Sequence, residues 1–192
     1  MHNWMTESIE IQIARQCAPV LAGVKPSNIL ILEDGNIAEI TRMLDGTPVG
    51  CRLLSGGGGN SVWLLYRRES LEKILTDKPK MEFLRCFGYR YQDVEEALWL
   101  LGRRFQSYKQ KSMEFPHEMG IFLGYPLGDV KGFIRHRGRD FLYCGYWKVY
   151  ENEAEARKLF SVYTSVKQQM LRELYQGKHV WQMIPNHAAM AV

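Results

Sequence analysis

The sequence predicts an α+β fold in a single domain, residues 1–177, followed by a poorly ordered tail, residues 178–192. Composition, periodicity and the lack of a linker predict this class. Of the 192 residues, 46% are hydrophobic and 24% are charged, which is the composition of an ordinary globular domain. Short β-prone runs alternate with segments of helical periodicity, and no linker long enough to divide the chain separates them. The tail, with its Pro, Asn, His and Ala residues, is expected to lack order.

The first half of the chain predicts a helix, a buried strand, a short helix and a hairpin. Apolar residues at helical spacing indicate a helix from about Glu7, with Thr6 or Ser8 as N-cap, which Pro19 kinks or ends. Cys17 then lies on the buried face of this helix. The elements expected next are the strand Ile29–Leu32, the helix Ile37–Leu44, and the hairpin strands Val49–Leu54 and Ser61–Tyr66.

The second half predicts several helices and one further strand. Polar and apolar residues alternate over Phe141–Tyr150, which indicates one strand of a sheet. All these elements together predict a small mixed or antiparallel sheet in a split βαβ (ferredoxin-like) order, with an N-terminal helix, a helical insertion and a C-terminal helix. The expected helices begin at Ser70, at Pro79 with an end at Gly88, at Asp93 with an end near Phe105, at Pro116, at Pro126 and at Asn152.

The charge distribution argues against a dedicated nucleic-acid binder. Lys and Arg number 25 and Asp and Glu number 21, so the formal net charge is only +4. The excess lies in residues 101–140, which hold eight basic and four acidic side chains. A basic cluster over residues 131–139 could hold an anion or an acidic partner, but a solvated surface is the preferred interpretation. Nucleic acid is therefore not the expected partner.

Cysteine usage and hydropathy indicate a cytoplasmic protein. The four cysteines, Cys17, Cys51, Cys86 and Cys144, are far apart and form no CxxC pair. No signal peptide is expected, because Met1–Gln12 lacks an apolar core. These features are typical of free thiols in a reducing compartment. No stretch approaches the roughly 20 consecutive apolar residues of a membrane span, so an integral membrane protein is not expected.

The glycine-rich segment Ser55–Asn60 does not predict a phosphate site. Glycine-rich backbone can direct its N–H groups at an anion. A phosphate loop opens a helix, however, and here the glycines lead into the strand that begins at Ser61. A flexible hairpin loop is the preferred interpretation.

The segment Phe115–Glu118 carries the most suggestive chemistry. Pro116 at the first helical position places His117 and Glu118 in a first turn, where the helix dipole favours a neutral imidazole and an ionised carboxylate. A neutral imidazole suits metal ligation or general-base catalysis. Position 121 is isoleucine, so the segment is not the HExxH pattern of a zinc protease. The alternative is a surface histidine beside a glutamate that stabilises the helix end.

Two cysteines are candidates to join this segment. Cys144 lies on the polar-aromatic face of its strand near Lys148, and a nearby ammonium favours a thiolate. Cys17 and Cys144, with His117 and Glu118, are the right residue types for a metal site or for a Cys–His nucleophile pair. The alternative for each cysteine is a small core residue, because free cysteine is often buried.

Four longer motifs in the chain are unusual. They are CAPVLAG with KPSN at residues 17–28, FPHEMGIFLGYP at 115–126, DVKGF at 129–133 and CGYWKVY at 144–150. Together they resemble the family called domain of unknown function 3793 (DUF3793) over nearly the whole chain. The resemblance implies a soluble bacterial protein with these segments as its signature, but no particular activity, fold or cofactor. Within the signature, Lys25, Asn28, Tyr146 and Lys148 are candidates to bind a cofactor.

Two hypotheses of function follow. In the first, Cys17, His117, Glu118 and Cys144 converge on one pocket, which binds a metal or a small cofactor, or performs thiol chemistry with a cysteine as nucleophile and His117 as base. In the second, the protein is a non-catalytic interaction or ligand-binding module with structural cysteines, and the signature glycines and prolines serve packing and helix punctuation. Cofactor, substrate and oligomeric state stay open, and the partner is an unidentified small molecule or protein.

Overall fold

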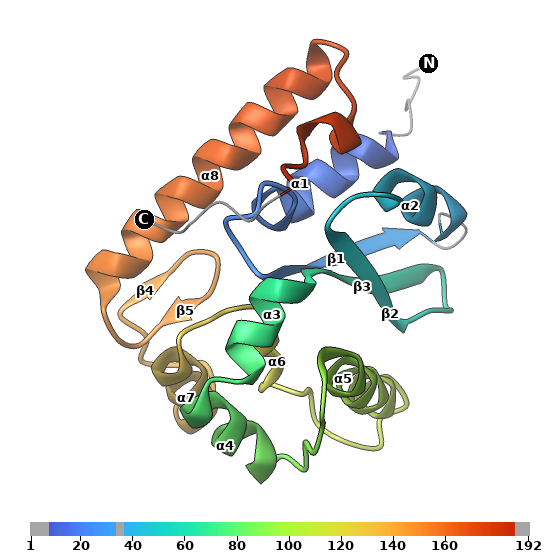
Figure 1. Ribbon diagram of the computed structural model, residues 1–192. Coiled ribbons are helices and arrows are strands. Elements are labelled where there is room, and N and C mark those ends of the chain that lie inside the picture. Colours follow the sequence, from blue (N-terminus) through green and yellow to red (C-terminus); the bar gives the residue numbers. More distant parts are fainter. Residues whose placement is uncertain (1–7, 34–36, 187–192) are drawn as a thin grey trace, which may run out of the picture.

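The computed structural model describes residues 8–33 and 37–186 of the chain (Figure 1). Helices are combined with small antiparallel sheets, so the predicted α+β class is confirmed. No helix in this described part of the chain is both long and apolar enough to cross a membrane. The elements in chain order are α1 (Ile9–Leu21), β1 (Ser27–Glu33), α2 (Ile37–Leu44), β2 (Val49–Ser55), β3 (Asn60–Arg67), α3 (Arg68–Leu75), α4 (Lys78–Cys86), α5 (Val94–Lys109), α6 (Met119–Phe122), α7 (Leu127–Arg135), β4 (Tyr143–Cys144), β5 (Lys148–Val149), α8 (Glu153–Tyr175) and the 3-10 helix η1 (Val180–Met183).

Helix α1 begins at a predicted cap and continues past its proline. The Ser8 side chain accepts a hydrogen bond from the backbone N–H of Ile11 at 3.4 Å, which satisfies one of the free donors of the first turn. The helix ends at Leu21, two residues beyond Pro19. Cys17 lies on its buried face, as predicted.

The main sheet has three strands in the order β1-β3-β2, and both edge strands run antiparallel to β3. β2 and β3 are the predicted hairpin, which is confirmed. Residues 57–59 of its loop are glycines with positive φ. Glycine adopts this conformation without the strain that a side chain would add, which explains the glycine-rich loop without a ligand.

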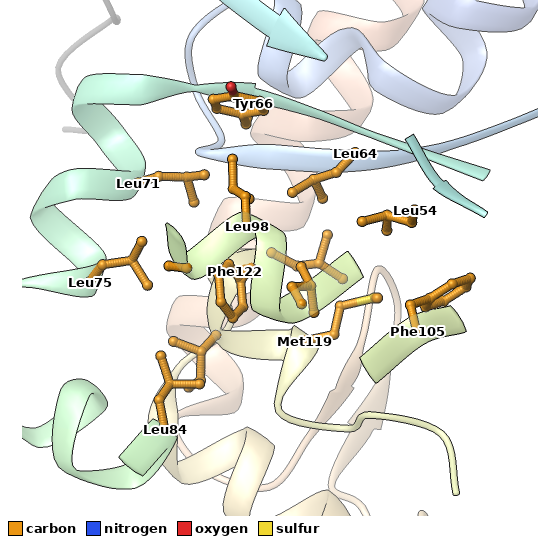
Figure 2. Packing of buried hydrophobic residues seen from close by; sticks show 14 of the residues in the cluster. Leu54, Leu64, Tyr66, Leu71, Leu75, Leu84, Leu98, Phe105, Met119 and Phe122 are labelled. Carbon is orange, nitrogen blue, oxygen red and sulfur yellow. The ribbon is translucent and has the colours of Figure 1, made fainter. Parts of the chain in front are cut away.

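Hydrophobic clusters cover both faces of this sheet. Side chains alternate along β3, so that Leu64 and Tyr66 face one side while Trp63 and Leu65 face the other. Helices α3 to α7 close over the first side, where Leu64 and Tyr66 meet residues such as Leu71 and Phe122 (Figure 2). Helices α1, α2 and α8 cover the second side (Figure 1). The sheet is thus the central layer between two helical layers.

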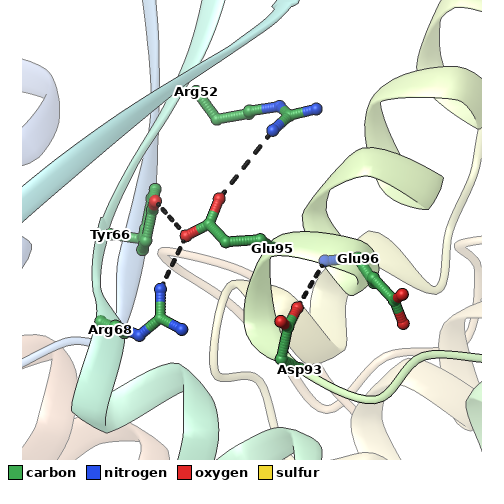
Figure 3. Close-up of polar contacts among 6 residues, drawn as sticks. All are labelled: Arg52, Tyr66, Arg68, Asp93, Glu95 and Glu96. Carbon is green, nitrogen blue, oxygen red and sulfur yellow. Dashed lines mark hydrogen bonds and ion pairs between the residues drawn. The ribbon is translucent and has the colours of Figure 1, made fainter.

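Polar contacts fix α5 against the sheet (Figure 3). Asp93 caps this helix by accepting a hydrogen bond from the backbone N–H of Glu96 at 2.9 Å. Glu95 accepts a hydrogen bond from the Tyr66 hydroxyl at 3.1 Å and one from Arg68 at 2.9 Å. Burial and the neighbouring Glu95 carboxylate raise the pKa of Tyr66 to about 12. The tyrosine therefore keeps its proton at neutral pH and remains a donor that joins β3 to α5.

Residues 141–150 form a separate hairpin and not one strand of the main sheet. Strands β4 and β5 contain two residues each and pair antiparallel across a turn at Gly145. The prediction of one strand over Phe141–Tyr150 is wrong, because polar-apolar alternation looks the same in one strand and in the two arms of a tight hairpin. Since this segment does not join the main sheet, the ferredoxin-like order is not confirmed.

A third hydrophobic cluster joins the β4–β5 hairpin to α8. Trp147 and Val149 pack against Phe160 and Tyr163. The rings of Trp147 and Phe160 meet edge to face with 4.4 Å between their centroids. A Cβ atom on Gly145 would collide with the Phe160 ring, so glycine at this position lets the hairpin lie directly on α8.

The C-terminal segment differs from the poorly ordered tail that we expected. Helix η1 lies in it, and Val180 and Ile184 are buried in the cluster beneath α1. Glu10 of α1 accepts a hydrogen bond from the backbone N–H of Val180 at 2.8 Å. These contacts join residues far apart in the sequence, so the composition of the tail does not reveal them. Residues 187–192 lie outside the described part of the chain.

Candidate functional site

A pocket of about 420 Å³ lies between α6, α7 and the β4–β5 hairpin. This volume is in the range of small-molecule sites in proteins. Most of its lining is apolar or aromatic, with walls that include Phe115, Met119, Val130, Phe133 and Trp147. An apolar pocket with few polar groups is the usual form of a small-molecule site.

Four of the eight predicted site residues line this pocket: His117, Cys144, Tyr146 and Lys148. Cys144 and Lys148 are directly opposite each other in the β4–β5 pair, so their side chains share one face of the hairpin. The thiol of Cys144 belongs to an exposed residue and is therefore accessible. The Tyr146 hydroxyl lies 3.3 Å from the Thr164 hydroxyl of α8, at hydrogen-bonding distance.

The imidazole of His117 is positioned by aromatic rings. Its centroid lies 5.3 Å from that of Phe115 and 5.0 Å from that of Phe133. Neither ring nitrogen forms a hydrogen bond with another of the described residues. The nitrogens are also not fully buried, because buried side-chain nitrogens without a partner would be unsatisfied and these are not among them. Both nitrogens are therefore free to meet a ligand. Helix α6 begins only at Met119, so His117 precedes the helix and does not lie in its first turn.

Lys148 places a fixed ammonium group at the pocket. Its Nζ donates a hydrogen bond to the carbonyl oxygen of Gly138 at 2.7 Å. The same atom lies 5.8 Å from the centroid of Phe133 and 5.0 Å from that of Phe141, distances that allow cation–π attraction. No carboxylate of the described residues forms an ion pair with it.

Asp129 is a pocket residue that the sequence did not single out. Its carboxylate is only 2% exposed and lies in the first turn of α7, where the helix dipole favours negative charge. It accepts hydrogen bonds from Trp147 Nε1 at 2.7 Å and from the backbone N–H groups of Tyr150 and Glu151 at 2.7 and 2.9 Å. These bonds fasten the hairpin to α7. The sequence does show an acidic residue in the first turn of a helix that follows Pro126. Its hydrogen-bond partners lie about 20 residues further along the chain, so the sequence does not reveal its role.

Glu118 points away from the pocket. It is 1% exposed and accepts hydrogen bonds from Arg104 Nε and from the Tyr89 hydroxyl, the latter at 3.2 Å. Burial, and then the Glu118 carboxylate, raise the pKa of Tyr89. The glutamate therefore belongs to a buried ion pair with α5.

Cys17 is separated from the pocket by its position on α1. The side chain has no exposed area, and its Sγ lies 3.6 Å from the carbonyl oxygen of Ile29 as a weak donor. Burial raises the pKa of the Cys17 thiol well above its ordinary value. Such a thiol is neither accessible nor ionised near neutral pH, which identifies it as a core residue.

Lys25 and Asn28 lie outside the pocket lining. Asn28 is buried, and its side-chain oxygen accepts a hydrogen bond from the backbone N–H of Val20 at 3.3 Å. Lys25 is 4% exposed, and its Nζ lies 5.3 Å from the centroid of Tyr125, a residue of the pocket wall. Burial lowers the pKa of Lys25 from 10.5 to about 8. Lys25 therefore contacts the pocket wall from outside it, whereas Asn28 joins β1 to α1.

The predicted metal site is not assembled. Among residues 8–33 and 37–186, no group of three or more His, Cys, Asp and Glu side chains is placed to hold a metal ion. Cys17 and Glu118 face other parts of the core, which leaves His117 and Cys144 at the pocket.

Glycines of the signature motifs allow close packing around the pocket. A Cβ atom on Gly120 would lie 2.8 Å from a methyl group of Val130. On Gly124, which has φ +77°, it would collide with Pro26. These positions have no room for a side chain, so the glycines bring α6 close to α7 and to the start of β1.

Comparison with known proteins decides the family of the chain. The family described as Protein of unknown function (DUF3793) matches residues 13–184. The chain belongs to this family. The match confirms the resemblance that the CAPVLAG, FPHEMGIFLGYP and CGYWKVY motifs indicated. No curated protein and no solved structure matches the chain.

Proposed function

We propose that this protein binds a small organic molecule in the pocket between α6, α7 and the β4–β5 hairpin. One observation carries the proposal: an apolar pocket of about 420 Å³ holds an accessible thiol, together with an imidazole and an ammonium that have no hydrogen-bonded or carboxylate partner, respectively, among residues 8–33 and 37–186. Apolar walls supply affinity by burying ligand surface, and the few polar groups fix its orientation. Cys144 is the candidate for any thiol reaction with the bound molecule, and His117, which also lines the pocket, is the candidate base.

Two exposed cysteines provide a test with an internal control. Cys144 lines the pocket, whereas Cys86 is exposed on α4. The rate of alkylation by N-ethylmaleimide is measured at each site by peptide mass spectrometry, with and without naphthamide, a neutral bicyclic aromatic probe. We expect the probe to slow alkylation of Cys144 several-fold and to leave Cys86 unchanged.

Matched variants sharpen this test. Cys144→Trp fills the pocket from its rim, whereas Cys86→Trp places the same side chain on the outer face of α4. Calorimetry should detect naphthamide binding to the Cys86→Trp protein and not to the Cys144→Trp protein. If neither this probe nor its carboxylate analogue naphthoate protects Cys144 or binds to the wild type, the small-molecule pocket is refuted and the interaction-module hypothesis replaces it.

A further inference from the structure

We propose that the ligand of this pocket is an anion, with an apolar and preferably aromatic body and a single carboxylate or phosphate group. The inference rests on the proposed function and adds the chemical class of the ligand. It follows from the two charged groups that line the pocket. The carboxylate of Asp129 is already engaged in hydrogen bonds within the protein, whereas the ammonium of Lys148 has donors left over.

The negative charge of the pocket is already engaged. The Asp129 carboxylate is buried and accepts three hydrogen bonds, from Trp147 Nε1 and from two backbone N–H groups. These bonds hold both of its oxygens toward the hairpin. A cationic ligand would have to displace them, and buried hydrogen bonds to a charged group are expensive to break. The pocket is therefore poorly suited to an ammonium ligand.

The positive charge of the pocket has no such compensation from the part of the chain that the structure describes. An ammonium carries three N–H donors, and Lys148 uses one of them on the Gly138 carbonyl. The rings of Phe133 and Phe141 hold the group in place, so little conformational entropy would be lost when it binds an anion. Charge-assisted hydrogen bonds to carboxylate or phosphate are the strongest use of the two remaining donors.

The surface beside Lys148 adds to the positive potential. Arg137 and Arg139 flank Gly138, both are exposed, and neither forms an ion pair with a described residue. The one carboxylate of this loop, Asp140, lies 3.4 Å from His136. Like charges on the surface beside such a lysine raise the local concentration of anions.

The test compares two ligands of nearly equal shape. Naphthoate and naphthamide share the same rings and differ by one negative charge at neutral pH. We expect calorimetry to give naphthoate an affinity at least about tenfold higher than naphthamide, because a charge-assisted hydrogen bond adds at least this factor. Raising the salt concentration from about 0.05 M to about 0.5 M should weaken the binding of naphthoate and leave the affinity for naphthamide unchanged. Naphthyl phosphate, measured in parallel, distinguishes a phosphate site from a carboxylate site.

Two lysine variants assign the effect. Lys148→Met should reduce naphthoate affinity to that of naphthamide while naphthamide still binds, which also shows that the variant is folded. Lys167→Met is the control, because Lys167 Nζ lies 6.0 Å from the Tyr146 ring but does not line the pocket. Its ratio of affinities should equal that of the wild type.

The outcomes separate the two proposals. Equal affinities for naphthoate and naphthamide in the wild type would overturn the anionic ligand and leave the small-molecule pocket standing. A preference for naphthoate that survives in Lys148→Met would overturn the role of this lysine. If neither compound binds and neither protects Cys144, the proposed function fails and the anionic ligand fails with it.

Discussion

Replacing Lys25 with methionine should stabilise the protein at pH 7. Lys25 is 4% exposed, and within the described residues its ammonium has no hydrogen-bond or carboxylate partner. Its one favourable contact there is with the face of the Tyr125 ring, 5.3 Å away. Removing most of the water around a charge without supplying a charged partner is unfavourable, and this explains why its pKa falls to about 8. Methionine has a similar length, no charge and a flexible side chain that fills irregular space.

The size of the effect follows from the pKa. The difference between 10.5 and 8, at about 1.4 kcal/mol per pKa unit, gives about 3 kcal/mol for keeping the ammonium charged in the folded state. The contact with Tyr125 offsets about 0.5–2 kcal/mol of this. We therefore expect Lys25→Met to raise the free energy of unfolding by about 1–3 kcal/mol at pH 7.

The lowered pKa of Lys25 also makes the stability difference between the two proteins depend on pH. Below pH 8 Lys25 is protonated in both states, and above pH 10.5 it is neutral in both. Between these values the unfolded chain binds more protons, so the stability of the wild type rises with pH. The advantage of the variant should therefore shrink by about 1.4 kcal/mol between pH 7 and pH 9. Burial raises the pKa of the Cys17 thiol and the charge of Lys25 opposes this, so the substitution raises that pKa further. The folded-state thiol stays protonated in both proteins between pH 7 and pH 9, and its contribution therefore cancels in the difference over this range.

Urea unfolding at pH 7, 8 and 9, followed by tryptophan fluorescence, measures the difference. Lys167→Met is the matched control, because its ammonium also lies over a ring but its side chain is only partly buried. The control should show no advantage that declines with pH. A Lys25→Met protein that is less stable than the wild type at pH 7, or an advantage that stays constant up to pH 9, would refute the reasoning.

Three further substitutions test the core around the pocket by urea unfolding. The buried Tyr150 hydroxyl has no hydrogen-bond partner in the described part of the chain, so Tyr150→Phe should leave stability unchanged or raise it by up to about 1 kcal/mol, and a loss of that size would contradict this. Glu118→Gln removes the carboxylate partner of the partly buried Arg104 and should destabilise the protein by about 3 kcal/mol, whereas a neutral result would mean that this ion pair contributes nothing. Gly120→Ala forces the methyl groups of Val130 aside and should destabilise by about 1–3 kcal/mol, and unchanged stability would show that the wall yields freely.

Local patterns in the sequence predicted the elements that depend on local interactions. Helix α5 was expected over Asp93–Phe105 from its apolar stripe, and it extends over Val94–Lys109 with Asp93 as its cap. The hairpin of β2 and β3 followed in the same way from β-prone runs around a glycine loop. The segment Phe141–Tyr150 could not be resolved by pattern, because polar and apolar residues continue to alternate through the three-residue turn at its centre, as they would in a single strand.

The candidate site was predictable only in part, for a related reason. His117, Cys144 and Lys148 came from chemically suggestive motifs, and the fold brings them to one pocket. Cys17 and Glu118 were chosen for the same chemistry, but the sheet and α5 draw them into separate parts of the core. Residue type and spacing identify reactive groups, whereas their mutual positions depend on contacts between distant segments that only the folded chain provides.

The signature motifs contain two kinds of residue: those that build the fold and those that line the pocket. The two kinds can be adjacent in the sequence. Asp129 and Gly132 build the fold, the first by holding the hairpin and the second by leaving space for the Tyr150 ring, while Phe133 beside them lines the pocket. Packing accounts for the first kind. It accounts only in part for Lys148, whose ammonium bonds to the Gly138 carbonyl and contacts two rings but has no carboxylate partner among the described residues. A ligand that supplies the missing negative charge explains why a cation stands there. On this view, changes at the packing residues should appear in the free energy of unfolding, and a change at Lys148 should appear in the affinity for anions.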